Sequence, residues 1–237
     1  MPCGVDKSIE IYYYIIDRRT IKIIDRLSIK QFGAKMKLKE VKIQFITDVA
    51  TDLFLKRSIN EVTIKDIATA AGVGEATVYR YFERKQNIVE RSALSLQKKV
   101  YEEYFNLYGE NGYEKIKCFY AGYIKVFDAH PEFYKFINEF DAYMVNETHD
   151  LAEYSEGLDM FKTAFFAAYR QGIADGSVRE TENAELFYYT SAHALLSLCK
   201  KLAAGRDIVK QDSLTDKADE VKELIKALLF YVKKPLA

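Results

Sequence analysis

Residues 63–82 combine side chains that can bind nucleic acid with a spacing typical of two short helices joined by a tight turn. Thr63 can cap the first helix, with Asp66 well placed in its first turn. Ala68 is small enough for two helices to cross closely, and Gly72 suits a turn that needs a positive φ angle. The space between the helices is expected to be filled by apolar residues: Ile64, Ile67, Val73, Val78 and Tyr81.

The other residues of the second helix are expected to face outward: Gly74, Glu75, Ala76, Thr77, Tyr79 and Arg80. Hydroxyl and charged groups on such a face can bond to phosphates and to base edges. The spacing therefore predicts a helix-turn-helix whose second helix, Gly74 to Tyr81, enters the major groove of DNA.

The segment resembles the TetR family of bacterial transcriptional regulators, from about Lys39 to Ile88. The most specific matches are 63–68 (TIKDIA), 71–73 (AGV) and 77–82 (TVYRYF), with Lys85 opening the next helix. The rest of the chain resembles the family in helical layout and length. The resemblance implies contacts to DNA phosphates from Thr63, Tyr79, Tyr81 and Lys85, and contacts to base edges from Glu75, Ala76 and Thr77. Capping alone would also explain Thr63.

Gly74-Glu75 departs from the family pattern, which often has Ser-Lys there. A carboxylate near the groove repels phosphate but can accept a hydrogen bond from the amino group of cytosine. Glu75 is therefore either a base-specific contact or an outward residue that contacts nothing.

The charge balance excludes binding to DNA through a broad positive field. The chain has 35 basic and 35 acidic residues, and the stretch from Met36 to Glu83 has seven of each. Binding must then depend on where individual Lys, Arg, Tyr and amide groups lie.

The sequence contains no set of residues typical of an enzyme. It has no Gly-rich phosphate loop, no His-Glu-x-x-His and no supported Ser/His/Asp set, so we predict no catalytic residue and no cofactor. The three cysteines are few and far apart, and the three histidines lack metal-ligand spacing, so we predict no metal site and a reducing, cytoplasmic location. No apolar run is long enough to cross a membrane.

The pattern beyond Leu38 is helical, and the expected fold is all-α. We expect a helix-turn-helix DNA-binding domain at 36–84 and a helical ligand-sensing and dimerisation domain at 85–237. Residues 1–35 are rich in β-formers, and two hypotheses remain open for them. Either translation naturally starts at Met36, or the segment is a basic arm that touches DNA beside the main site.

Local signals predict the helix boundaries. In the first helix, Leu38, Val41, Phe45, Val49 and Leu53 share one apolar stripe. A long helix runs from Lys85 or Gln86 to near Tyr108, where Gly109 and Gly112 end it. His130-Pro131 marks a boundary, and Gly172 and Asp175-Gly176 end another helix. The last two helices are expected at about Thr181–Ala204 and Leu214–Lys233.

The body is rich in aromatic residues, with 18 Tyr, 15 Phe and no Trp. Helical aromatic stripes usually form core, but apolar pockets between helices also bind small molecules, and both can hold at once. The candidates for a pocket that binds an unknown small-molecule effector are Tyr123, Phe127, Phe140, Tyr143, Met144, His149, Phe165 and Tyr169. His193 is interpreted as structural.

The resemblance implies a homodimer joined through the last two helices. The continuous apolar band from Val221 to Val232 supports it, as does a stripe with small residues on the preceding helix. The interface candidates are Ala192, Leu195, Cys199, Leu224, Leu228 and Val232. Two recognition helices roughly 34–36 Å apart would then meet successive major grooves of a palindrome in double-stranded DNA.

These observations favour a ligand-responsive repressor that leaves its operator when a hydrophobic or aromatic effector binds. Three alternatives remain open. The first is an activator or a corepressor-dependent regulator. The second is a DNA-binding protein whose body senses nothing. The third is an enzyme fused to a degenerate DNA-binding domain.

Overall fold

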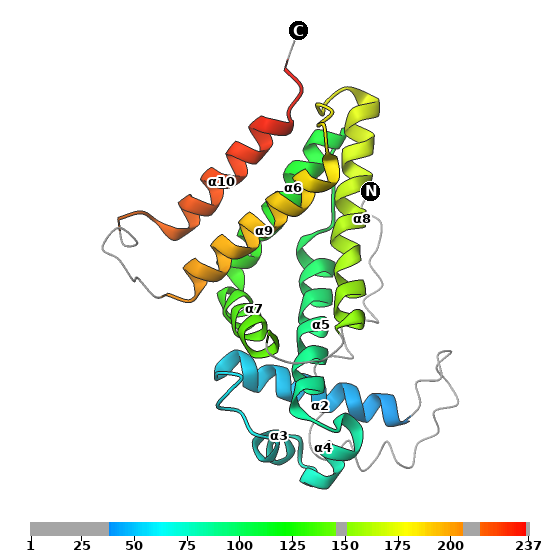
Figure 1. The fold of residues 1–237 in the computed structure, drawn as a ribbon, viewed down its shortest axis with the longest axis vertical. Helices are drawn as coiled ribbons and strands as arrows, with labels where there is room; N and C mark the ends of the chain where they lie inside the picture. The colour runs from blue at the N-terminus through cyan, green and yellow to red at the C-terminus, as the bar shows by residue number, and fades with distance from the viewer. Residues whose placement is uncertain (1–37, 146–150, 206–213, 236–237) are drawn as a thin grey trace, which may run out of the picture.

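The computed structural model describes residues 38–145, 151–205 and 214–235. Every regular element within these ranges is an α-helix, which confirms the all-α prediction. Figure 1 shows an elongated molecule with α2, α3 and α4 at one end, below the bundle of later helices. The expectations for residues 1–35 and for His149 lie outside the described residues.

The predicted DNA-binding domain, which we call the DNA-binding end, consists of α2 (Leu38–Lys56), α3 (Ile64–Ala71) and α4 (Glu75–Phe82). Helix α2 packs against α3, α5 and α7, so it buries a broad face centred on Ile46, Ala50 and Phe54. The stripe expected from the sequence is not the centre of this buried face. Its residues are each half-buried (Leu38, Val41, Phe45, Val49 and Leu53).

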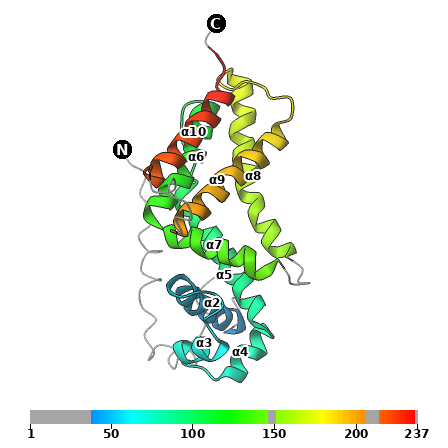
Figure 2. The ribbon, with the colours of Figure 1, turned by 60° about the vertical axis from the view of Figure 1, so that its left-hand side comes forward.

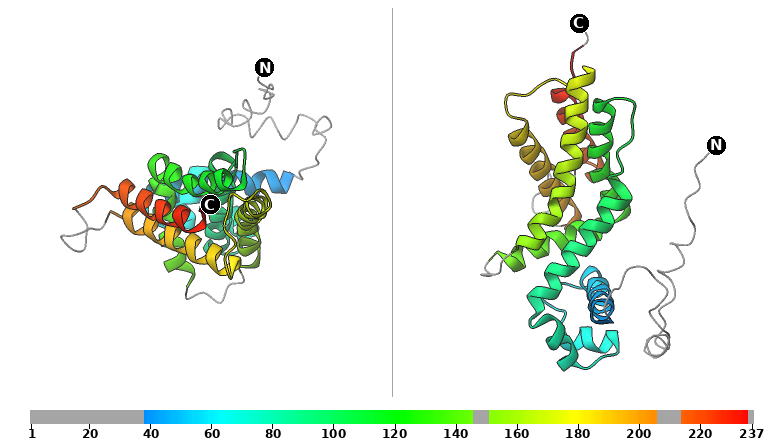
Figure 3. Two further views of the ribbon diagram at one scale, coloured as in Figure 1. Left: turned by 90° about the horizontal axis from the view of Figure 1, so that it is seen from above. Right: turned by 90° about the vertical axis from the view of Figure 1, so that its right-hand side faces the viewer.

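Helix α5 (Lys85–Tyr104) runs from the DNA-binding end into the body, as the right-hand view of Figure 3 shows. It ends four residues before the predicted Tyr108, because the chain turns to bury Phe105 in the body. The Phe105 ring packs edge-on against Phe119, at 5.3 Å between centroids, and Phe161, at 4.8 Å. Burial of one aromatic ring thus ends the helix before the glycines do.

The body consists of α6 (Gly112–Ala129), α7 (Pro131–Met144), α8 (Ala152–Asp175), α9 (Ala184–Ala203) and α10 (Lys217–Val232) (Figures 1 and 2). The predicted boundary at His130-Pro131 is confirmed, with Pro131 opening α7. Helices α9 and α10 begin three residues after their predicted starts, because Asn183 and Asp216 act as their caps.

Two glycines that the sequence analysis assigned to helix ends instead lie where α6 meets α8. A Cβ on Gly112 would lie 2.0 Å from the backbone nitrogen of Gly172, and one on Gly172 would lie 2.3 Å from a methyl of Val178. Gly172 is inside α8, which continues to Asp175 and ends at Gly176 with φ +78°. The two glycines let these helix backbones touch.

The core of the body is mostly aromatic. Phe165 of α8 lies within 5.4 Å of Phe119 and 5.1 Å of Tyr188, measured between ring centroids. None of the described helices is both long and apolar enough to cross a membrane.

Candidate DNA interface and the cavity of the body

The turn between α3 and α4 is closed by backbone hydrogen bonds. Gly72 adopts φ +66°, its N–H donates to Thr69 O at 3.2 Å, and the N–H of Val73 donates to Ala68 O at 3.0 Å. This pair of bonds is the Schellman arrangement, which needs a left-handed residue at Gly72. Ala68 of α3 and Val78 of α4 are both buried, and the two helices pack against each other. The turn therefore fixes the direction of α4, which is the predicted recognition helix.

The outer face of the recognition helix is open to solvent. Gly74 is its N-cap, Glu75 and Ala76 are exposed in its first turn, and the Tyr79 side chain is 50% exposed. Thr77 and Tyr81 are half-buried. Glu75, Ala76 and Tyr79 thus lie outward as expected, whereas Thr77 is less exposed than expected, and the individual contacts to DNA remain predictions.

Arg80 is a candidate that we left out of the site prediction. Its guanidinium is exposed and lies over the Tyr81 ring, 5.0 Å from the centroid. Stacking on a ring holds a long cationic side chain in place without neutralising its charge. The outward position of Arg80 in the helical period was the signal that pointed to it.

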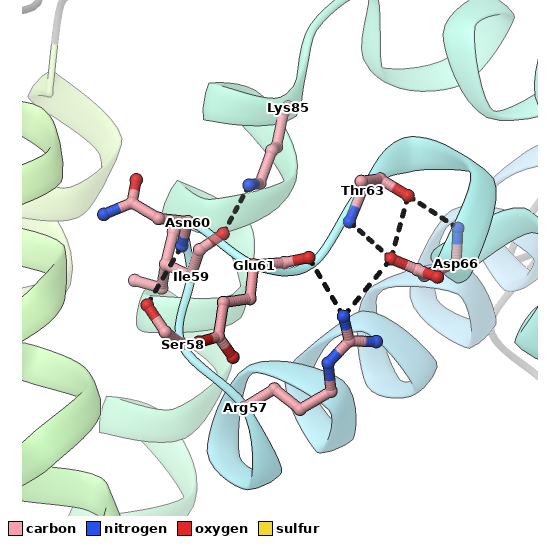
Figure 4. A network of polar contacts seen from close by, with 8 residues as sticks. All are labelled: Arg57, Ser58, Ile59, Asn60, Glu61, Thr63, Asp66 and Lys85. Carbon is pink, nitrogen blue, oxygen red and sulfur yellow. Dashed lines mark hydrogen bonds and ion pairs between the residues drawn. The ribbon is translucent and has the colours of Figure 1, made fainter.

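Thr63 and Asp66 form a reciprocal capping box at the start of α3 (Figure 4). The N–H and the hydroxyl of Thr63 both donate to Asp66 Oδ2 at 2.8 Å, and the N–H of Asp66 donates to Thr63 Oγ1 at 3.1 Å. Arg57 adds an ion pair to the same carboxylate at 3.6 Å. The Thr63 hydroxyl proton is thus engaged, and a phosphate would have to compete with Asp66 for it.

Lys85, predicted to contact phosphate, points inward instead. Its ammonium donates to the carbonyl oxygen of Ile59 and lies 5.4 Å from the centre of the Tyr143 ring. Burial lowers the pKa of Lys85, and the nearby Asp66 charge opposes this shift. The ammonium therefore anchors the loop between α2 and α3, as Figure 4 shows.

A second side chain holds the same loop residue. Glu139 of α7 accepts a hydrogen bond from the N–H of Ile59 at 2.8 Å. Both backbone groups of Ile59 are thus bound by side chains from the long helices of the rest of the molecule, an arrangement that we call the Ile59 clasp (Lys85, Ile59 and Glu139). No local sequence signal identified Glu139.

A cavity of about 240 Å³ lies in the body between α5, α6, α7, α8 and α9. Its walls are largely aromatic, including Phe105, Tyr123, Phe133, Tyr134, Phe161 and Tyr188. Of the predicted pocket residues Tyr123 lines it, and so does His193, which we had interpreted as structural. Phe127, Phe140, Tyr143, Met144, Phe165 and Tyr169 pack elsewhere in the hydrophobic core, because their helix faces meet neighbouring helices directly.

Polar groups of α8 and α9 also line the cavity. Lys162 lines it and forms an ion pair with Glu185 at 2.6 Å, while its ammonium donates to the Tyr189 hydroxyl at 2.9 Å. The hydrogen bond to Glu185 and then that to Tyr189 raise the pKa of Lys162, because both stabilise its charged form. Asp159 and His193 line the same cavity.

The predicted dimer residues divide into two groups. Leu195, Cys199 and Val232 have no exposed surface in a single chain, which contradicts their assignment to a subunit interface. They were misassigned because each faces the protomer's own helices. Ala192 is half-buried beside the cavity, and Leu224 and Leu228 are half-buried on α10. The large apolar side chains that remain exposed on α9 and α10 include Leu186 and Phe230, which are 62% and 86% exposed.

Comparison with known proteins agrees with this geometry. The family model for bacterial regulatory proteins of the tetR family matches residues 46–91. The chain is 23% identical over 146 residues to the HTH-type transcriptional repressor KstR2 of Rhodococcus jostii (strain RHA1), covering 60% of this chain and 71% of that protein. It is 44% identical over 45 residues to the uncharacterized HTH-type transcriptional regulator YvkB of Bacillus subtilis (strain 168), covering 19% of this chain and 24% of that protein.

Solved structures share the fold along most of the chain. A putative TetR-family transcriptional regulator from Rhodococcus sp. has a TM-score of 0.62 at 16% identity, covering 80% of this chain and 99% of that one. The fatty acid degradation regulator FadR from Bacillus halodurans has a TM-score of 0.58 at 18% identity, covering 78% and 97% of the respective chains. The helix-turn-helix end of the chain therefore matches the DNA-binding domain of the tetR family of bacterial regulatory proteins, and its helical body shares the fold of solved TetR-family regulators.

Proposed function

We propose that this protein is a repressor that binds a palindromic operator as a homodimer and is released by a small apolar effector. The exposed outer face of the recognition helix, joined through α5 to a body with an aromatic cavity, carries this proposal. The name of the relative KstR2, a transcriptional repressor, agrees with the direction of regulation.

In the DNA-bound state, the recognition helix lies in the major groove. Glu75, Ala76 and Thr77 meet base edges, and Glu75 accepts a hydrogen bond from a cytosine amino group. Tyr79 and Arg80 reach phosphates on either side of the groove, because both are exposed near the end of α4. Thr63 and Lys85 act by holding the α2–α3 loop, through the capping box and the Ile59 clasp.

The dimer forms through the outward faces of α9 and α10, which lie side by side in the view from above in Figure 3. Leu186, Leu224, Leu228 and Phe230 replace the buried residues as the apolar contacts of this interface. Burial of these side chains against a second copy would remove apolar surface from water at about 25 cal/mol per Å².

The effector signal passes along α5. This helix lines the cavity with Gln97 and Val100 and carries Lys85 of the Ile59 clasp at its other end. An effector that favours a different placement of α5 changes the spacing of the two recognition helices, by as much as it prefers that state.

Selection of bound fragments from a genomic library by the purified protein tests the proposal. Recovery of a palindromic sequence, with affinity that falls steeply as salt rises, is expected. Fragments bound without sequence preference would overturn the repressor assignment.

Replacement of Tyr79 tests the recognition helix directly. Tyr79→Ala is expected to weaken operator binding roughly tenfold, because one phosphate contact is lost from each subunit. Tyr108→Ala is the matched control, since it removes a 69% exposed tyrosine between α5 and α6. Equal affinities of the two variants in a gel-shift titration would show that Tyr79 does not contact DNA.

A further inference from the structure

One buried polar atom in the cavity wall has no hydrogen-bond partner. Gln97 of α5 is 5% exposed, and its amide Nε2 donates to the Tyr154 hydroxyl at 2.6 Å. Its Oε1 has no partner among the described residues. Burial of an acceptor without a partner is unfavourable, because the atom loses its hydrogen bonds to water and gains none in return, so such an atom is seldom retained without a use.

The neighbours of Gln97 indicate which of its two amide atoms is available to an occupant of the cavity. Gln97 lines the cavity, whereas Tyr154, which holds the Nε2 side of the amide, does not. With Nε2 turned to Tyr154, Oε1 is the amide atom left for an occupant of the cavity. That occupant must bring a hydrogen-bond donor.

The rest of the cavity limits the size and shape of the occupant. A volume of about 240 Å³ lies just below the usual range of roughly 300–1,000 Å³ for ligand pockets. The rings of Phe105, Tyr123, Phe133 and Tyr188 line it, and aromatic rings favour edge-to-face or offset contacts with another ring. A compound with a single ring fits these limits.

The charges of the cavity argue against an anionic occupant. Lys162, which lines the cavity, is already paired with Glu185 at 2.6 Å, and Asp159 contributes a carboxylate to the lining. A carboxylate ligand would therefore have to break an existing ion pair and approach a like charge, which a neutral compound avoids.

We propose that the effector is a small neutral phenol or aromatic alcohol, whose hydroxyl donates to Gln97 Oε1 and whose ring lies among the aromatic side chains of the cavity. This assignment rests on the proposed effector role of the cavity and names the class of compound that fills it.

Calorimetric titration of the full chain without DNA tests the assignment with three matched probes: para-ethylphenol, its methyl ether para-ethylanisole, and para-ethylbenzoate. The phenol is expected to bind roughly tenfold more tightly than the ether, which lacks the donor, and more tightly than the carboxylate. Equal or tighter binding of the ether or of the carboxylate would overturn the proposal.

Substitutions in the protein test which residue accepts the hydrogen bond from the phenol hydroxyl. Gln97→Met keeps the length of the side chain and is expected to weaken phenol binding roughly tenfold while leaving ether binding unchanged. Ser92→Ala is the matched control, because it removes the other unpaired buried polar atom of α5, Ser92 Oγ, which does not line the cavity. Tyr154→Phe shows whether the bond to Nε2 matters by itself, and it is expected to change affinity less than Gln97→Met.

The outcomes separate this inference from the proposed function. Phenol binding that depends on Gln97 but leaves the DNA complex intact would support the assigned chemistry and contradict release by an effector. Operator binding without phenol binding would overturn the assigned chemistry and leave the DNA-binding function standing. If Gln97→Met does not fold, the three probes on the unmodified chain decide the question.

Discussion

The Thr63 side chain caps a helix, and this structural role is separate from any contact that it makes with DNA. Its hydroxyl both donates to and accepts from Asp66, so it fixes the first turn of α3, against which the recognition helix packs. This cap satisfies the N–H of Asp66, one of the N–H groups that every helix start leaves free. The position of α4 thus depends on a residue outside it.

Replacement of Thr63 measures this contribution. Thr63→Ala is expected to lower the free energy of unfolding by about 1 kcal/mol, because the cap is lost, and Thr63→Ser is expected to keep most of it. Urea denaturation of the DNA-free protein gives both values. Equal losses in the two variants would show that the methyl group, and not the hydroxyl, carries the effect.

The capping box of Thr63 and Asp66 predicts that the stability of the protein depends on pH. The hydrogen bonds from the Thr63 backbone and then from its hydroxyl lower the pKa of Asp66 below 3.8. Because the folded pKa is depressed, this contribution to stability is present above pH 3.8 and is lost as the pH falls through the folded pKa. The melting temperature of the unmodified chain is expected to exceed that of Asp66→Asn at neutral pH, and the difference should shrink in acid. A difference that is constant down to pH 2 would contradict the assignment.

The sequence predicted the outward face of α4 well, because short-range helical periodicity determines which residues share a face. It failed for Lys85 and Glu139. A long side chain at a helix start can turn either way, and its direction here is set by the Ile59 carbonyl and the Tyr143 ring. Only the tertiary structure brings those partners together.

At the scale of helices, the contact between α6 and α8 depends on missing side chains. Gly112 and Gly172 lie backbone to backbone. Glycine in a sequence usually marks a helix end, which is why both were interpreted that way. Local signals cannot distinguish a glycine that ends a helix from one that lets another helix approach.

Substitution of Gly112 tests this contact. Gly112→Ala is expected to destabilise the protein by about 1–3 kcal/mol, because the new methyl group would overlap the backbone of Gly172. Gly157→Ala is the control inside α8, since its methyl group meets only the end of the Leu94 side chain, which can rotate away. Thermal denaturation of both variants gives the comparison, and equal losses would show that the crossing tolerates a side chain.

At the scale of the whole molecule, the distribution of apolar surface bears on assembly. Phe230 is 86% exposed on α10, although it lies next to residues that the protomer buries fully, such as Val232. The sequence could identify α10 as unusually apolar but not which side of it faces a second copy. That division depends on how α10 rests on α6 and α9.

Phe230→Ser is expected to weaken the dimer. Operator affinity should fall with it, because a single subunit binds one half-site without the gain in affinity from a linked second subunit. Sedimentation analysis across a range of concentrations measures the dimer, and gel-shift titration measures operator binding. Tyr108→Ser is the control for loss of an exposed aromatic ring away from this surface. A Phe230→Ser protein that remains dimeric would place the interface elsewhere.

The Ile59 clasp has a consequence for protein engineering. Lys85 and Glu139 hold both backbone groups of a loop that belongs to the DNA-binding end, and they come from helices of the other part of the chain. A chimaera that joins residues 38–84 to the body of another regulator would carry Ile59 without either partner. Such grafts should regain a well-placed recognition helix only when the recipient body also supplies a lysine and a carboxylate at the equivalent positions, so the exchangeable unit extends beyond the helix-turn-helix.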